Sequence, residues 1–470
     1  MLITRYILKH HRVANCSYLI NFAKLLSSNN RVRIMDPDVK YREDPVVIKL
    51  DNDLFKSIFT PELDYLVEIF AKYKYEVRIA GGAVRDLVMG KKPTDLDFAT
   101  VATPQEMKNM FDAENIRMIN MNGEKHGTIT ARINNQENFE CTTLRIDVVT
   151  DGRHAEVEFT KDWLLDANRR DLTINSMFLG LDGSIFDYFY GYEDLLERKV
   201  RFVGNADKRI KEDFLRILRY FRFYGRISND PDKHDDKTIQ IISNNVEGLQ
   251  NISGERIWVE LKKILQGNYA EELMLKMADC GISTFIGLPE TPNTEEFKRL
   301  KENKIQNVDY NPMTLMCALL YTPEDALKLH ERLKFSAYER DLMYFIMKSR
   351  ETDQDLDNLL TFRQMCLQTF IGKPKDVKEY VEEFLKFLCK KDLYEKLKEW
   401  QIPRFPIDGS TLKQHGCPSG KIMGTIFSKL KEIWAQNEFK STSDELLNEL
   451  PKILKELNIV DGKQVKKART

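Results

Sequence analysis

Two aspartates separated by a single residue, Asp95 and Asp97, have the type and spacing that could support metal-dependent chemistry. On a β-strand, residues two positions apart point to the same face, so the two carboxylates would be neighbours and would repel one another. A pair of Mg²⁺ ions relieves that repulsion and serves nucleotidyl transfer, because one ion activates an attacking hydroxyl while the other binds a triphosphate. The alternative is a strand edge with solvated acids, which the Asp-x-Asp spacing alone leaves open. Glu140, in the run FECTTLR, would supply a third carboxylate from a neighbouring strand.

The segment before these aspartates has the composition of a phosphate-binding turn. An extended run, EVRIA, enters Gly81-Gly82, and a helical pattern follows. Because neither glycine has a side chain, backbone N–H groups there can approach a triphosphate at the positive end of the helix. Arg85, one turn into the helix, can add a charge-assisted contact. A Gly-Gly pair before a helix also occurs as a simple tight turn, so this feature gains weight only beside the carboxylates.

A second group of polar residues lies between Glu212 and Arg222, where the spacing predicts one helix with Asp213 and Arg216 on the same face. Cytosine and adenine share an exocyclic amine beside a ring-nitrogen acceptor, whereas uracil and guanine present the reverse. An aspartate that accepts from the amine and an arginine that donates to the ring nitrogen would select C and A. The alternative is an amphipathic helix with intrahelical ion pairs, each contributing about 0.2 to 0.5 kcal/mol.

The elements that must position these residues form a mixed α/β head. From Leu54 to Asp187, extended runs rich in β-branched residues alternate with short helical patterns. Thr103-Pro104-Gln105-Glu106 has the signature of a capping box, with proline at the first helical position, and predicts a helix running toward Phe111.

After the head, the sequence changes to long periodic segments that predict helices alone. This pattern begins near Asn205 and is broken by the charged loop 228–237. His234-Asp235 in that loop could suggest a phosphohydrolase metal dipeptide, but a lone pair in a charged loop favours simple solvation. The predicted fold is therefore α+β, with a mixed α/β head followed by an all-helical remainder.

The order of these motifs resembles known families. GGAVRD followed by G-x-x-x-x-D-L-D resembles the first motif of the nucleotidyltransferase superfamily, and Arg169-Arg170-Asp171 leading into Asn175 resembles its second motif. Glu212-Asp213-x-x-Arg216 resembles the E-D-x-x-R motif of class II CCA-adding enzymes, in which the protein itself serves as template. The resemblance covers residues 76–267.

The resemblance implies a role for each residue in these motifs. Asp95 and Asp97 would hold Mg²⁺, and Glu140 would be a third catalytic carboxylate. The implied nucleotide contacts are Gly81, Gly82 and Arg85 for the triphosphate, Arg170 and Asp171 for phosphate and ribose, Asp213 and Arg216 for the base, and Arg219 and Arg222 for the rest of the pocket.

The activity implied by the resemblance is addition of the 3′-terminal CCA to tRNA precursors from CTP and ATP, without a nucleic-acid template and with release of pyrophosphate. One alternative is a poly(A) polymerase of the same superfamily. Such enzymes typically have a basic G-R-R-F-R-like signature, where this chain has RMINMNGEKHGTITARI, whose loop 123–128 is more similar to CCA-adding enzymes. The other alternative is a tRNA-binding protein without catalysis, although binding alone needs no metal-spaced carboxylates.

The family's architecture implies four parts: a head at 50–188, a neck with the base-reading helix at 189–250, a body at 251–340 and a tRNA-binding tail at 341–470. In the neck and body, Glu255 and Arg256 would brace the helices that position the reading pair. In the tail, Lys413, Lys421 and the terminal KQVKKART would meet tRNA phosphates or form a solvated basic end.

Composition bounds the remaining possibilities. The 470 residues, 42% of them hydrophobic, suffice for several packed units. Because 72 Lys and Arg balance 73 Asp and Glu, any nucleic-acid surface must be local.

The seven cysteines contain no C-x-x-C pair, which fits a reducing compartment and disfavours structural zinc. No apolar stretch approaches the roughly 18 residues of a membrane-spanning helix, and we expect a monomer or homodimer without a stable protein partner.

The first 34 residues differ from the rest of the chain. They contain six Lys or Arg residues and no acid: Arg5, Lys9, Arg12, Lys24, Arg31 and Arg33. This is the composition of a mitochondrial transit peptide, and the alternative is a basic leader without an address. Translation from Met35 would remove the leader, so we expect a mitochondrial form and a cytosolic or nuclear form.

Overall fold

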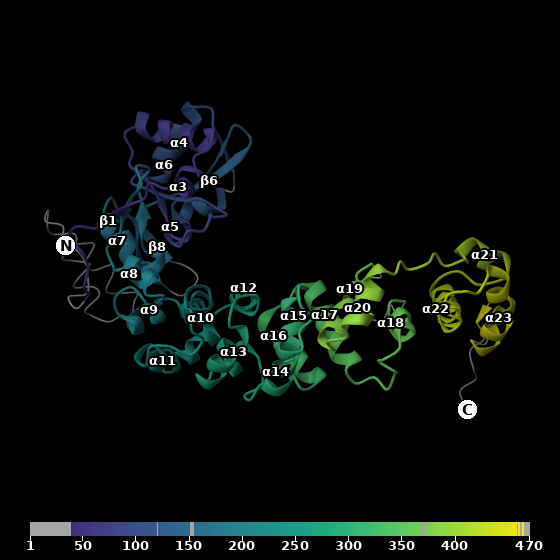
Figure 1. Ribbon diagram of the computed structural model, residues 1–470. Helices are drawn as coiled ribbons and strands as arrows, with labels where there is room; N and C mark the ends of the chain where they lie inside the picture. Colours follow the sequence, from purple (N-terminus) through teal and green to yellow (C-terminus); the bar gives the residue numbers. More distant parts are fainter. Residues whose placement is uncertain are drawn as a thin grey trace, which may run out of the picture. The chain divides into compact units, whose positions relative to one another are not determined.

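The computed structural model describes residues 39–119, 121–150, 155–367, 373, 375–457, 459–460 and 463–464. The predicted leader and Met35 lie outside these residues. The chain divides into two compact units, the first ending at Asp213 and the second beginning at Phe214, and each is described by itself. The α+β fold predicted above is confirmed: a mixed sheet in the first unit and helices in the second (Figure 1).

One mixed sheet forms the frame of the first unit. Its strands, in spatial order, are β1 (Val46–Lys49), β10 (Ser184–Phe186), β9 (Phe178–Leu179), β2 (Val77–Ala80), β3 (Asp97–Thr100), β6 (Glu137–Thr143), β5 (Thr128–Ile133) and β4 (Arg117–Ile119). The pair β3–β6 is parallel, and the other pairs of this sheet are antiparallel. The centre of the sheet is shielded from solvent: β2 is buried throughout, and Phe98 packs edge-to-face on Phe139 at 5.8 Å between ring centroids.

Helices and a hairpin complete the first unit. They are α3 (Asp53–Lys56), α4 (Pro61–Lys72), α5 (Gly82–Val88), α6 (Pro104–Ala113), the hairpin β7 (Arg145–Thr150) and β8 (Ala155–Phe159), α7 (Trp163–Asn168), α8 (Gly191–Leu196) and α9 (Ala206–Glu212). The predicted capping box is present in α6: Thr103 accepts from the Glu106 N–H at 3.3 Å, and the Glu106 carboxylate accepts from the Thr103 N–H at 2.7 Å.

Helix α7 is anchored on the sheet by aromatic contacts. Trp163, its first residue, packs edge-to-face on Phe178 of β9 at 4.9 Å between ring centroids. The Arg78 guanidinium lies over the Trp163 ring at 4.1 Å, and the Trp163 indole N–H donates to Glu76 at 3.0 Å. These contacts fix the segment that follows α7, which contains the predicted Arg-Arg-Asp motif.

The second unit is built from helices: α10 (Leu215–Ile227), α11 (Asp236–Ser243), α12 (Gly254–Leu265), α13 (Ala270–Asp279), α14 (Thr294–Glu302), α15 (Pro312–Cys317), α16 (Pro323–Leu333), α17 (Ala337–Ser349), α18 (Leu359–Met365), α19 (Val377–Phe387), α20 (Lys391–Glu399), α21 (Gly409–Gln414), α22 (Lys421–Gln436) and α23 (Ser443–Glu456). One detail departs from the all-helical prediction: β11 (Ile459–Val460) and β12 (Lys463–Gln464) pair as a short antiparallel hairpin. Among the described residues, no helix combines the length and apolarity that crossing a membrane requires.

Close packing of helices near α12 requires a glycine. Gly254, its first residue, is buried, and a Cβ there would collide with the carbonyl oxygen of Arg332 in α16. The Arg332 guanidinium in turn donates to the carbonyls of Phe285 at 2.9 Å and Leu249 at 2.8 Å. The helices around α12 are therefore held by both packing and hydrogen bonds to backbone.

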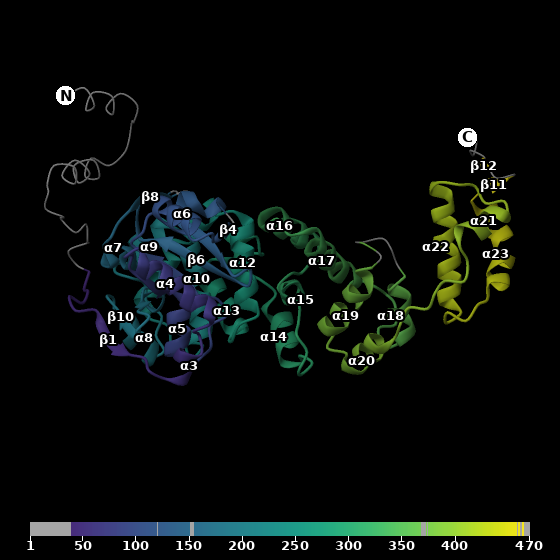
Figure 2. The same cartoon turned by 90° about the horizontal axis from the view of Figure 1, so that it is seen from above.

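The last three helices share a core of their own. Leu412 from α21, Ile426, Leu430 and Trp434 from α22, and Leu450 from α23 are buried against one another. Figure 2 shows α22 and α23 side by side, in yellow. The predicted tail lysines lie outside this core, since Lys413 in α21 and Lys421 at the start of α22 are both exposed.

Candidate active site

Three carboxylates gather where β3 begins. Asp97 is the first residue of β3, and its register partner on the parallel strand β6 is Glu140. Asp95 is exposed and precedes the strand, so the prediction that both aspartates lie on one strand is wrong for Asp95. Desolvation, followed by the negative charges of Glu140 and Asp95, raises the pKa of Asp97, while Arg170 opposes the rise. Asp97 therefore lies within electrostatic reach of both other predicted catalytic acids.

This arrangement fits a cation that arrives with its substrate. Within the described ranges, no group of three or more His, Cys, Asp or Glu side chains is placed so that it could hold a metal ion by itself. Mg²⁺ is commonly held by one or two carboxylates together with substrate phosphates and water, rather than by a protein cage. Burial and, after it, the charges of Glu140 and Asp95 raise the pKa of Asp97, and a bound divalent cation would relieve the repulsion between these carboxylates.

The glycine turn brings a second charged group beside α5. Gly81 caps this helix with φ of 67°, a conformation that favours glycine, and makes no side-chain cap. A Cβ on Gly81 would lie 3.3 Å from Arg170 Nη1. The predicted turn and the predicted second motif therefore meet, with the Arg170 guanidinium over the turn.

Arg85 is directed into the protein. Its side chain is only 4% exposed, and it donates through Nη1 to Asn175 Oδ1 at 2.6 Å and through Nε to Asp86 Oδ1 at 3.1 Å. In this structure Arg85 thus braces α5 against the segment that contains Asn175. Its direct contact with a triphosphate stays a prediction.

The Arg-Arg-Asp motif is organised by Asp166 and Asn175, two residues to which sequence reasoning assigns no role. Asp166 of α7 is fully buried and accepts from Arg170 Nη2 at 3.0 Å and from Arg169 Nε at 2.9 Å. Asn175 accepts from Arg170 Nη1 through its backbone carbonyl at 3.2 Å, and its side-chain amide donates to Asp171 Oδ1 at 3.4 Å. Asp166 precedes the two arginines by three and four residues, the spacing of ion pairs along a helix. That spacing is the sequence feature that could have identified Asp166.

The predicted base-reading helix is interrupted. Helix α9 ends at Glu212, Asp213 is extended with φ of −154° and ψ of 106°, and α10 begins at Leu215. The prediction that Asp213 and Arg216 share a face of one helix is therefore wrong. The division between the two compact units falls directly after Asp213, and the pairing of these residues with a base stays a prediction.

Two further arginines predicted for the nucleotide pocket, Arg219 and Arg222, contact an acid of α12. Arg222 Nη1 lies 3.2 Å from both carboxylate oxygens of Glu260, and Arg219 Nη1 lies 3.9 Å from one of them. Glu260 is buried, whereas Glu255, the acid predicted to brace these helices, is exposed. Glu260 thus connects α12 to α10, and the bracing role expected of Glu255 and Arg256 stays a prediction.

The charged loop before α11 contains a stacked histidine rather than a solvated pair. The His234 ring stacks on Tyr224 with 3.8 Å between ring centroids, and its Nδ1 lies 3.0 Å from the Tyr220 hydroxyl. Burial, and then the charge of Lys276, lower the pKa of His234 to about 4. Asp235 accepts from the Thr238 N–H at 2.8 Å and caps α11, so the dipeptide is structural.

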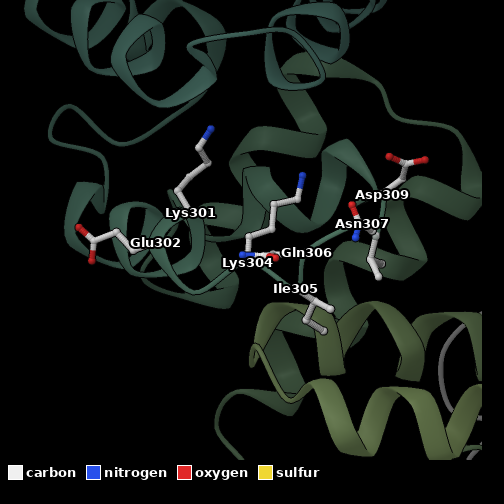
Figure 3. Close-up of a pocket in the computed structure, with 8 residues that line it drawn as sticks. Lys301, Glu302, Lys304, Ile305, Gln306, Asn307 and Asp309 are labelled. Atoms are coloured by element: carbon white, nitrogen blue, oxygen red, sulfur yellow. The ribbon is translucent and has the colours of Figure 1, made fainter.

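A surface recess of about 680 Å³ lies in the second unit after α14. Figure 3 shows Lys301 and Lys304 extending in the same direction along it; Glu302 is the last residue of α14, and Asp309 lies on the loop that follows. None of the residues predicted for the site lines it. Its two acids offset its two lysines, so the recess has no clear preference for an anion.

Comparison with known proteins agrees with this geometry. Residues 77–201 match the Poly A polymerase head domain, and residues 234–293 match the probable RNA and SrmB-binding site of polymerase A. The carboxylates, the glycine turn and Arg170 all lie within the first match. The chain thus has the catalytic head of a nucleotidyltransferase, a class that generally uses divalent metal ions.

Full-length relatives narrow the class to one family. The chain is 50% identical over 410 residues to the Mus musculus protein "CCA tRNA nucleotidyltransferase 1, mitochondrial", an alignment that covers 86% of this chain and 93% of the relative. The Homo sapiens protein of the same name has the same identity and coverage. The chain belongs to the family of CCA tRNA nucleotidyltransferases.

Solved structures of CCA-adding enzymes have the same fold. The enzyme from Bacillus stearothermophilus in complex with CTP matches with a TM-score of 0.67 at 23% identity, covering 86% of this chain and 100% of that chain. The Thermotoga maritima CCA-adding enzyme, complexed with tRNA, matches with a TM-score of 0.58 at 20% identity, covering 88% and 99%. At these identities the likeness concerns the fold alone.

Proposed function

We propose that this chain adds the 3′-terminal CCA to tRNA, one nucleotide at a time, from CTP and ATP, with release of pyrophosphate. The observation that carries the proposal is the opposition of Asp97 and Glu140 on β3 and β6, with Arg170 within electrostatic reach. Family membership supplies the choice of tRNA as acceptor, because relatives aligned over 93% of their length are named for that activity.

Within the site, Asp95 and Asp97 would hold Mg²⁺, and Glu140 would add negative charge beside them. When bound, Mg²⁺ supplies Lewis-acid activation of the tRNA 3′ hydroxyl and charge stabilisation for the leaving pyrophosphate. Arg170, over the Gly81 turn, would bind a phosphate oxygen of the nucleotide. Arg85 would contact the triphosphate and Asp171 the ribose, and Asp213 with Arg216 would accept C and A at the base.

The strongest competing activity is that of a poly(A) polymerase, since the head matches a domain named for it. The two activities make different products. The decisive experiment incubates purified protein with Mg²⁺ and a tRNA transcript that lacks its last three nucleotides, using CTP alone, ATP alone and both together. Addition of two C residues with CTP alone and of CCA with both supports the proposal, whereas a long A tail supports the polymerase.

We propose in addition that the chain is imported into mitochondria by its basic leader and that a form beginning at Met35 serves the cytosol and nucleus. The leader's six basic residues and the mitochondrial names of the two mammalian relatives support the first part. A fluorescent reporter fused to residues 1–34 tests it. A reporter that stays cytosolic contradicts import, and the full chain with Met35 changed to leucine should lose its non-mitochondrial fraction.

A further inference from the structure

We propose that Asp166 is a positioning residue that presets the Arg170 guanidinium to receive a phosphate of the incoming nucleotide. The inference rests on the proposed function, because it assumes a nucleotide substrate. It concerns a residue outside the carboxylate, glycine-turn and Arg-Arg-Asp motifs.

The contacts of Asp166 account for both of its carboxylate oxygens. Oδ2 accepts from Arg170 Nε at 3.2 Å and from Arg170 Nη2 at 3.0 Å. Oδ1 accepts from Arg169 Nε at 2.9 Å and from the backbone N–H of Arg145 at 3.1 Å. Because Asp166 is fully buried, water does not compete for these oxygens. Both oxygens of the carboxylate are thus used in hydrogen bonds to the three arginines Arg145, Arg169 and Arg170.

Arg170 is held on its other side as well. Its Nη1 donates to the Asn175 carbonyl at 3.2 Å, and its guanidinium lies over the Phe178 ring at 4.8 Å. A guanidinium has five N–H groups. The contacts among the described residues use the Nε–H, one N–H of Nη1 and one N–H of Nη2. One N–H on each terminal nitrogen is left over, and a guanidinium donates such N–H groups to the oxygens of a phosphate.

The charges explain why an acid is needed at this position. Burial, followed by the charge of Arg169, lowers the pKa of Arg145 to about 10, so the cations of this group repel one another. Burial alone would raise the pKa of Asp166, but Arg169 and Arg170 outweigh it and hold that pKa below its ordinary value. Asp166 therefore stays ionised and is the anion that lets Arg169 and Arg170 share one small space. Without Asp166, the Arg170 guanidinium would lose its fixed orientation. The effect would therefore not be limited to the free energy of unfolding.

A purely structural role makes a different prediction. In that case Asp166 would stabilise α7 by ion pairs, and any weakening of α7 would have the same consequence. Asp162 offers a matched control on the same helix, since it accepts from the Leu164 N–H at 3.0 Å as the N-cap. Asp162→Ala weakens α7 and leaves Asp166 and its arginines in place.

The experiment compares Asp166→Asn, Arg170→Ala, the double variant and Asp162→Ala in the full chain. We expect Asp166→Asn to raise KM for CTP and ATP alike, by about 10-fold or more, because phosphates are common to both nucleotides. The Kd for tRNA should stay within about 2-fold of the wild-type value. Since Asp166 acts through Arg170, the double variant should match Arg170→Ala alone to within about 2-fold.

Two results would overturn the inference: a double variant whose KM is the product of the two single effects, or an Asp162→Ala variant whose nucleotide KM rises as much as that of Asp166→Asn. If Asp166→Asn does not fold, Asp166→Glu keeps the charge and serves the same cycle. Its KM should rise, and its double variant should again match Arg170→Ala. Wild-type protein that adds no nucleotide to truncated tRNA contradicts the proposed function instead, so the two failures are distinct.

Discussion

Asp97 and Glu140 are register partners on the parallel strands β3 and β6, so the sheet holds two acids of like charge beside one another. The raised pKa of Asp97 shows that the fold disfavours its ionised form. Like charges directly opposite on neighbouring strands are destabilising. A folded protein retains such a repulsion between carboxylates where its function requires it. A divalent cation is the ligand that attracts both carboxylates and so offsets their repulsion.

Neutralising Asp97 should separate stability from activity. In Asp97→Asn one of the opposed charges is removed, so the free energy of unfolding without metal should rise by about 0.2 to 1 kcal/mol. Nucleotide incorporation should be lost, since the removed metal contact is worth several kcal/mol of barrier. Thermal melts and incorporation assays measure the two effects.

The effect of Mg²⁺ on the melting temperature supplies the control for the Asp97→Asn variant. Mg²⁺ with a non-hydrolysable nucleotide should raise the Tm of the wild type, because it binds only the folded state, and should raise the Tm of Asp97→Asn much less. Asp95→Ala should also lose incorporation while retaining tRNA binding. Near-normal turnover by either variant would remove the metal assignment.

The two glycines of the turn should respond differently to alanine. At Gly81, φ is 67° and a Cβ would press on Arg170 Nη1, so Gly81→Ala should lose about 1 to 2 kcal/mol of stability and raise the nucleotide KM. At Gly82, a Cβ would make an ordinary 3.5 Å contact with Arg85 Nη2. Gly82→Ala should therefore fold normally, within about 0.5 kcal/mol. If it also raises KM, the backbone at Gly82 approaches the nucleotide, and an unchanged KM would contradict that role.

The part of the site that was predicted correctly is local in sequence. The glycine turn, the helix after it and the capping box at Thr103 depend on residues within one turn of each other, so their types determine the structure. The interruption at Asp213 was missed because Glu212 to Arg222 has helical spacing throughout and contains neither glycine nor proline. The spacing therefore carries no signal of the break after Glu212.

The missed residues are missed for a different reason. Asp166 and Glu260 are buried acids, whereas an acid in a sequence is ordinarily assigned to the surface. Their partners Arg170, Arg219 and Arg222 are predicted to contact the nucleotide. That prediction leaves no place for a buried acid that balances their charge. In α12, Glu260 is the acid that contacts Arg222 of α10, and the spacing of the helix does not single it out, because the face that becomes buried depends on packing against α10.

His234 predicts a pH dependence of stability in the second unit. Its pKa is lowered from 6.5 to about 4, so between these values the unfolded chain binds a proton that the folded chain does not. The free energy of unfolding should therefore fall as the pH is lowered from about 6.5 toward 4. Lys276, Asp230 and Asp232 act on the same histidine and do not reverse this sign.

The matched variant for that prediction is His234→Phe, which keeps a ring against Tyr224 and cannot titrate. It removes the ring nitrogen that lies 3.0 Å from the Tyr220 hydroxyl, so at pH 7 it should lose about 1 kcal/mol of stability. Between pH 7 and 5, however, its Tm should fall less than that of the wild type. Equal slopes for the two proteins would show that His234 does not carry the dependence.

The final prediction concerns base selection by Asp213 and Arg216. Removing the carboxylate in Asp213→Ala leaves the amine of C or A without its acceptor, at about 1 to 3 kcal/mol for an unsatisfied group. UTP should suffer less, because its carbonyl no longer faces a carboxylate, so the rate with CTP and ATP should fall while the preference over UTP narrows. Asp95→Ala is the control, since losing metal should lower incorporation of every nucleotide alike. Single-turnover rates with CTP, ATP and UTP decide between the roles: equal loss for all three in Asp213→Ala would leave Asp213 as the residue that joins α9 to α10, with no part in reading the base.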